Sequence, residues 1–66
     1  MTNLTGKIVQ FLHRTNDFAI AIMDTGEERI KILGALYGVD KGEVITVRGE
    51  WRTHPKYGRQ FAVDRW

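Results

Sequence analysis

The sequence predicts an all-β fold, a small five-stranded antiparallel barrel, on three observations. Apolar residues recur at alternate positions in short runs, which is typical of strands with one buried face. Turn-forming Gly, Asn, Asp and Pro separate these runs at intervals of about ten residues. With 66 residues and no cysteine, the chain has room for one hydrophobic core and no disulfide to support it.

The first predicted strand covers residues 4–14, which are rich in β-branched and aromatic side chains. Ile8 and Phe11 differ in parity along this strand. If both point into the core, a β-bulge must lie between them. Residues 15–17 are small and polar and form the turn that follows.

The second predicted strand covers residues 18–24 and the third covers residues 29–33. Alternation in the third strand directs Ile30 and Ile32 inward and leaves its cations outside. In the second strand, Ala19, Ala21 and Met23 share one face. The small alanines leave space either for a ligand backbone or for large side chains of a neighbouring strand, and the second interpretation is favoured.

Residues 34–42 contain three glycines and too few residues for a stable helix, so they form a loop or a single turn. Leu36 and Val39 are expected to anchor this loop in the core. The fourth predicted strand covers residues 43–51, with a bend at Gly49. The fifth covers residues 60–66. The inward residues of these two strands are Ile45, Val47, Trp51, Phe61 and Val63.

Five strands with the widest gap between the third and fourth fit a barrel of the oligonucleotide/oligosaccharide-binding (OB) kind, with its usual helix reduced to a loop or single turn. An SH3-like barrel of the same size is the alternative, because periodicity does not fix strand order. In an OB-fold the loops after strands one and four flank the ligand face. These are residues 14–17 and 52–59, so Arg14 is expected on the same side as the second loop.

Residues 52–59 combine cations with flat rings. The cations are Arg52, Lys56 and Arg59, with no carboxylate between them. The neighbouring rings are those of Trp51, His54 and Tyr57. Cations favour a phosphate backbone, and rings beside them favour the bases of single-stranded nucleic acid. Pro55 and Gly58 restrict the loop, which lowers the entropic cost of presenting these side chains.

Two structural interpretations of the same segment remain open. Loops between strands are often basic because they are solvated, and Tyr-Gly commonly closes a turn. Trp51 is in phase with the inward residues of the fourth strand, so core packing is its favoured role.

The charge distribution and the residue composition argue against several classes of function. Residues 1–40 hold four Lys/Arg and five Asp/Glu, whereas residues 41–66 hold six and three, so the basic loop lies in the positive part. The sequence has no catalytic cysteine and no phosphate-binding Gly-rich loop, and His13 and His54 lack the spacing of metal ligands. We expect no cofactor, no metal, no small-molecule substrate and no membrane partner, and a cytoplasmic location.

Two motifs resemble the amino-terminal barrel of the long RecD-like DNA helicases, the bacterial class that acts apart from a RecBCD complex. The first motif comprises Gly6-Lys7-Ile8, Arg14, Asn16 and Phe18-Ala19-Ile20. The second and more specific one comprises Gly49-Glu50-Trp51 and the run from His54 to Phe61, His-Pro-Lys-Tyr-Gly-Arg-Gln-Phe. Asp17 departs from the pattern, because family members usually have glycine before this phenylalanine.

The resemblance spans nearly the whole chain. It implies that residues 1–66 are a single accessory domain, the amino-terminal module of an ATP-dependent helicase that moves 5′ to 3′ on DNA. The ATPase motifs of such a parent lie outside these residues, so this chain is expected not to be an enzyme. Its expected partners are DNA and the other domains of the helicase.

Two functions follow. The first is a non-catalytic module that binds nucleic acid, most simply single-stranded DNA. Its candidate binding residues are Arg14, Arg52, His54, Lys56, Tyr57 and Arg59. The alternative is a structural or protein-interaction module that packs on the helicase motor, in which Tyr57 packs across the barrel mouth and Gln60 bonds backbone groups. Exposure of Tyr57 distinguishes the two roles of that ring, because a ring buried against Trp51 or Phe61 cannot stack on a base.

Overall fold

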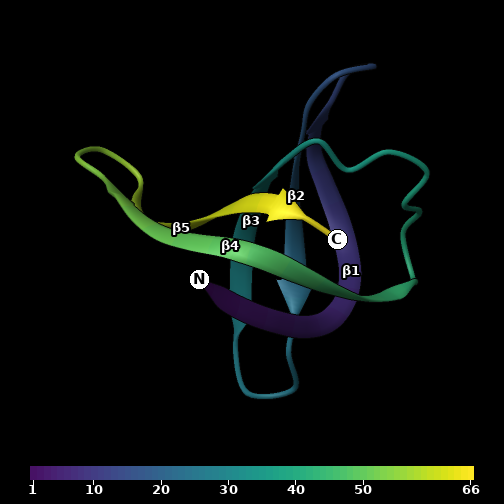
Figure 1. Cartoon of the computed structure of the whole chain (residues 1–66), viewed down its shortest axis with the longest axis horizontal. Coiled ribbons are helices and arrows are strands. Elements are labelled where there is room, and N and C mark those ends of the chain that lie inside the picture. Colours follow the sequence, from purple (N-terminus) through teal and green to yellow (C-terminus); the bar gives the residue numbers. More distant parts are fainter.

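The computed structural model describes residues 1–66 as five strands and no helix (Figure 1). The strands are β1 (Thr2–Arg14), β2 (Ala19–Asp24), β3 (Arg29–Gly34), β4 (Val44–His54) and β5 (Gly58–Arg65). They close into a barrel in the order β1-β2-β3-β5-β4. No helix is present that is long and apolar enough to cross a membrane.

The long strand β1 curves around the barrel and pairs with two partners. Its first half, residues 2–7, is antiparallel to β4, and its second half, residues 7–14, is antiparallel to β2. The register shifts between Ile8 and Gln10 and again between Phe11 and His13. These irregularities confirm the predicted bulge and let Ile8 and Phe11 both pack on the core.

In an OB-fold barrel the first strand pairs with both the second and the fourth, and this closes the ring. The strand order found here is that order, so the predicted OB-fold is confirmed and the SH3-like alternative is wrong. One detail differs. The β3–β5 pair that closes the ring is parallel, with Ile32 opposite Phe61 and Leu33 opposite Ala62. All other neighbouring strands are antiparallel.

The core contains eleven buried apolar residues drawn from every strand and from the β3–β4 loop. They are Ile8, Ala19, Ala21, Met23, Ile30, Ile32, Leu36, Val39, Ile45, Val47 and Phe61. Both alanines of β2 lie inside, where they make space for large neighbours, as the favoured interpretation predicted. The opposite face of β2, with Ile20 and Ile22, is only partly covered.

Gly49 is required where β4 bends over β5. A Cβ at this position would collide with the carbonyl of Ala62, and the register of the pair shifts between Arg48 and Gly49. Only a residue without a side chain allows the two backbones to approach this closely. The predicted bend is therefore confirmed, and it starts the segment of β4 that leads out to the basic turn.

The β3–β4 loop, residues 35–43, is fixed to the barrel. Leu36 and Val39 are buried, as predicted. The backbone of the loop is held by β1, because Gly42 N–H donates to the Ile8 carbonyl at 2.7 Å. This loop takes the place of a helix and covers one end of the core.

Strands β4 and β5 extend beyond the core as a two-stranded hairpin, which projects at the left of Figure 1. The arms that project are residues 52–54 and 58–60, and the turn at the tip is residues 55–57. Most of the segment predicted as a loop, residues 52–59, is therefore paired strand. The hairpin presents side chains on two faces because residues alternate along each arm.

Candidate nucleic-acid interface

The hairpin tip is closed by the side chain of His54. Its Nδ1 accepts hydrogen bonds from the backbone N–H groups of Lys56, at 3.0 Å, and Tyr57, at 3.2 Å. This one ring nitrogen therefore serves as the acceptor for two backbone donors of the turn. Pro55 fixes one backbone dihedral and Gly58 adopts a φ of 78°, so the tip has one defined shape.

Tyr57 stands exposed on this tip. Its exposed fraction is 59%, and its ring lies 4.7 Å from that of His54. The ammonium groups of Lys31 and Lys56 lie 5.3 and 5.5 Å from its centroid, within cation–π range. The ring is thus not buried against Trp51 or Phe61, and the prediction that it packs across the barrel mouth is wrong.

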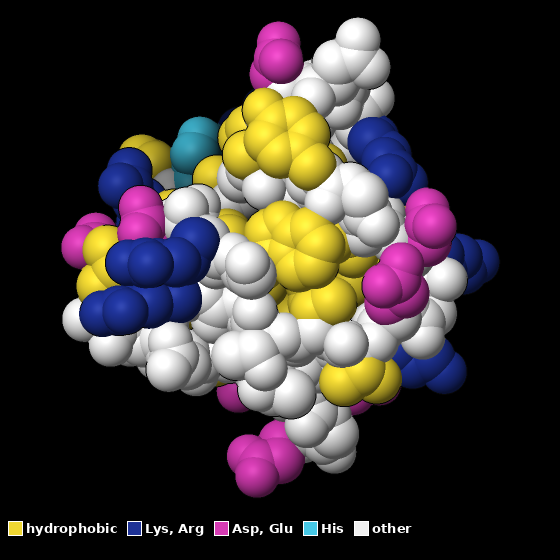
Figure 2. Space-filling view, turned by 45° about the vertical axis from the view of Figure 1, so that its right-hand side comes forward, with side chains coloured by type: hydrophobic (Ala, Val, Ile, Leu, Met, Phe, Trp, Pro, Cys, Tyr) yellow, Lys and Arg dark blue, Asp and Glu magenta, His cyan; other side chains and the backbone are white.

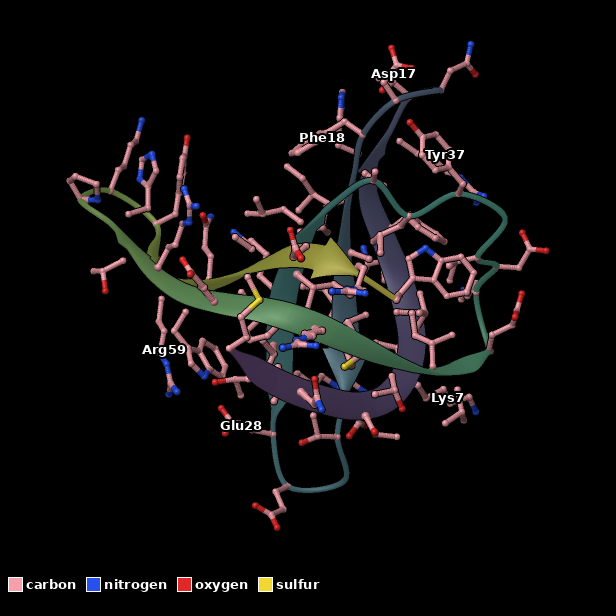
Figure 3. All side chains as sticks on the ribbon, viewed as in Figure 1. Lys7, Asp17, Phe18, Glu28, Tyr37 and Arg59 are labelled. Atoms are coloured by element: carbon pink, nitrogen blue, oxygen red, sulfur yellow. The ribbon has the colours of Figure 1, made fainter.

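The pleat of the hairpin divides the predicted binding residues between two faces. Arg52 and Gln60 lie opposite each other in the register, on the face that also carries His54. Arg59 lies on the other face with Trp51, and its guanidinium group is 3.6 Å from the Trp51 ring centroid. Figure 3 shows Arg59 below the ribbon of β4, on the side away from Phe18 and Asp17.

Trp51 serves the core, as the favoured interpretation held. It packs partly buried against the core cluster, and its ring meets that of Phe61 edge to face at 5.1 Å. The guanidinium of Arg59 covers it from outside. Arg59 therefore has an intramolecular partner as well as solvent exposure.

Arg14 is not gathered with the hairpin cations. It donates a hydrogen bond to the Val39 carbonyl at 2.9 Å and lies 3.8 Å from the carboxylate of Asp40. Its guanidinium also sits 4.4 Å from the Phe11 ring centroid. These contacts tie the end of β1 to the β3–β4 loop, so the side chain has a structural role there.

The turn after β1 forms although position 17 is aspartate and not the glycine that family members usually have. Thr15 Oγ1 accepts hydrogen bonds from the N–H groups of Asp17 and Phe18, and no residue other than glycine has positive φ. The threonine side chain thus supplies the closure that a glycine would otherwise ease. Figure 3 shows Asp17 in this turn, at the top of the view.

A groove of ≈ 420 Å³ lies between this hairpin and the end of β1. Its lining residues are Leu12, His13, Ile20, Lys31, Leu33, His54, Tyr57 and Gln60. We call it the outer groove, because it lies on the face of β2 that points away from the core. Of the two loops expected to flank a ligand face, residues 52–59 contribute His54 and Tyr57 to the lining, and residues 14–17 contribute none.

The floor of the outer groove is a row of side chains across three strands. His13 pairs with Ile20, and Ile20 pairs with Leu33. The lining includes the cation Lys31 and no carboxylate. The groove therefore offers an apolar floor, aromatic walls and positive charge at one place.

Six of these lining residues were not among the predicted binding residues: Leu12, His13, Ile20, Lys31, Leu33 and Gln60. A signal for them exists in the sequence, since Phe18, Ile20 and Ile22 put large apolar side chains on the outward face of the second strand. Alternation alone does not say which strands share that face. The closed strand order supplies this information.

Comparison with protein families gives one match, a family described as the OB-fold domain of the ATP-dependent DNA helicase YrrC, over residues 1–66. No curated protein and no solved structure matches the chain. The match covers the whole barrel, including the projecting hairpin and the outer groove. The chain therefore belongs to the family of OB-fold domains of the ATP-dependent DNA helicase YrrC.

Proposed function

We propose that this domain is a non-catalytic module that binds single-stranded DNA for a RecD-like helicase. The observation that carries the proposal is the exposed Tyr57 ring at the mouth of an apolar groove that contains no carboxylate. Membership of a helicase OB-fold family agrees with it. OB-folds bind oligonucleotides on this face of the barrel.

Different residues of the domain contact the bases and the phosphates of the bound strand. Tyr57, with His54 behind it at 4.7 Å, stacks on a base. Lys56 at the tip and Lys31 in the groove neutralise phosphates, and Arg52 extends the positive charge along β4. Arg14 and Arg59 contribute less, because each already has an intramolecular partner.

The shape of the groove favours single strands over duplexes. A base reaches an apolar floor only when it is neither stacked nor paired, and in a duplex both faces and the Watson–Crick edge are occupied. The outer groove is bounded by the hairpin on one side and the end of β1 on the other. An unpaired strand is the nucleic acid that fits between them.

The family match and the earlier resemblance together support a parent protein that contains this domain as its amino-terminal module. In that proposal the helicase is cytoplasmic and moves 5′ to 3′, and its motor domains are the second partner. The barrel holds or guides the strand while the motor supplies the ATPase.

Titration of the isotopically labelled domain with a thymine decamer, followed by NMR at about 20 and 150 mM salt, tests the proposal. We expect shifts at residues 54–57 and at Ile20 and Leu33, with affinity that falls as salt rises. The variant Tyr57→Ala should bind the decamer more weakly. Tyr37→Ala is its matched control and should bind normally, since the two tyrosines are about equally exposed, at 59% and 58%. Absence of shifts at both salt concentrations would overturn the proposal.

A second function, docking on the helicase motor, is favoured by a different face. Val44 at the start of β4 is 68% exposed and Trp66 is 48% exposed, and Tyr37 lies in the neighbouring β3–β4 loop. Figure 2 shows hydrophobic side chains gathered on this face, with acidic and basic side chains intermingled around them. Loss of parent helicase activity in Tyr37→Ala, with unchanged DNA affinity of the domain, would support docking.

A further inference from the structure

The side chain of Gln60 is available for a ligand. It lies on β5, is half-buried, and faces the outer groove. None of the side-chain hydrogen bonds of the structure involves its amide. The expectation that Gln60 bonds backbone groups is therefore wrong, and a fold requirement for its amide is absent.

A carboxamide in this position has the right chemistry for a base edge. It offers a donor and an acceptor side by side, and nucleobases present the same pair on their edges. The surrounding floor of Leu12, Ile20 and Leu33 holds the face of a base but cannot satisfy its polar edge. A base inserted into the groove without a polar partner would lose hydrogen bonds to water.

We infer that Gln60 hydrogen-bonds the edge of one base held in the outer groove and gives the domain a preference for adenine at that position. This inference rests on the proposed single-strand binding. Gln bonds adenine in a bidentate manner through N6 and N7, and a purine covers more of the apolar floor than a pyrimidine does. Gln60 is thus a specificity-determining residue, and Tyr57 supplies affinity.

The other polar residues of the groove are less suited to this role. Lys31 only donates, and its ammonium group lies 5.3 Å from the Tyr57 ring, where it balances a phosphate. His54 Nδ1 is already occupied by two backbone N–H groups. His13 lies in the floor beside Ile20, but its two ring nitrogens point in different directions and cannot both bond one base edge. Among these residues only Gln60 presents a donor and an acceptor side by side, on one amide group.

The experiment compares thymine decamers that carry one central adenine, cytosine or guanine with the all-thymine decamer, by fluorescence anisotropy. A single substituted base avoids the self-stacking of adenine runs, and the strand can slide to bring that base into the groove. We expect the central adenine to raise affinity on the order of tenfold over all-thymine in the unmodified domain. Gln60→Leu should remove this preference.

Gln10→Leu is the matched control, because Gln10 is an exposed glutamine of β1 outside the groove lining, and this variant should keep the adenine preference. Gln60→Glu provides a second variant that keeps the side-chain size. A carboxylate only accepts, so the preference should move from adenine toward guanine, whose unpaired edge presents two donors, N1–H and the N2 amino group. Thermal melting of each variant shows that it is folded.

The outcomes separate this inference from the proposed function. Binding of all four decamers with equal affinity, or an adenine preference unchanged in Gln60→Leu, overturns the role of Gln60 and leaves single-strand binding in place. Failure of the unmodified domain to bind any decamer overturns the proposed function itself. A preference lost in Gln60→Leu and kept in Gln10→Leu establishes the inference.

Discussion

The β3–β4 loop and the β4–β5 hairpin tip both connect successive strands of the barrel, but they hold their shape by opposite means. The loop buries Leu36 and Val39 in the core and is clasped by Arg14. The tip buries nothing and is closed by the ring of His54. One connection therefore serves stability, and the other presents its side chains.

The difference shows that rigidity and burial are separable in a small domain. A loop that plugs the core cannot also offer those side chains to a ligand. The tip keeps Tyr57 exposed because its shape comes from hydrogen bonds between a side chain and the backbone. Substitutions in the two connections should consequently affect different measurements.

The largest effect is expected from Leu36→Ala. Removing this buried side chain leaves a cavity in a core of only eleven residues, which should cost about 2–4 kcal/mol of unfolding free energy. Urea denaturation measures the loss. Tyr37→Ala, one residue further along the loop and exposed, should change stability by no more than about 0.5 kcal/mol. Equal losses in the two variants would contradict the anchoring role of Leu36.

Tyr57→Ala should show the reverse pattern. Loss of one stacking ring lowers the affinity for a single strand by about 1–3 kcal/mol, while the unfolding free energy stays within about 0.5 kcal/mol of the original. Calorimetric titration and denaturation of the same sample give both values. A marked loss of stability would mean that Tyr57 supports the fold.

Arg14→Met tests the clasp on the loop. Methionine keeps an apolar side chain near Phe11 but cannot donate to the Val39 carbonyl, so stability should fall by about 1–2 kcal/mol. Arg52→Met is the matched control, since Arg52 forms no ion pair within the domain. If both variants lose the same stability, the Arg14 contacts do not matter.

The smallest effect is expected from His54→Ala, which removes the acceptor that closes the tip. Stability should fall by about 0.5–1 kcal/mol, because the two amide groups remain accessible to water. Hydrogen exchange at Lys56 and Tyr57 should accelerate. His54→Asn restores a short acceptor and should recover part of the protection, whereas His13→Ala should leave the tip unchanged.

Much of the barrel could be predicted from alternation. The inward residues of β3, the alanine face of β2 and the bend at Gly49 all follow from local pattern and size. The outer arms of the hairpin could not be predicted in this way. Residues 52–54 and 58–59 are exposed and polar, so their strand pairing depends on backbone hydrogen bonds that leave no apolar signature.

The lining of the outer groove could be predicted only where its residues lie close together in the sequence. The sequence pointed to His54, Lys56 and Tyr57 because they follow one another. Ile20 and Leu33 lie on strands that only the closed topology brings to the hairpin. Likewise, the expected loop positions of an OB-fold grouped Arg14 with the hairpin, whereas its guanidinium group donates a hydrogen bond to the carbonyl of Val39.

The double pairing of β1 also sets the order in which this domain can assemble. Residues 2–7 meet residues 44–49 across most of the chain, and the parallel contact of β3 with β5 spans a long connection as well. Chain entropy delays such encounters until the local hairpins exist, so folding is expected in about milliseconds to seconds. The outer groove needs β1, β2, β3 and the hairpin together. The groove therefore forms only when the ring closes. The rate at which the refolding domain gains single-strand binding should report this last folding step.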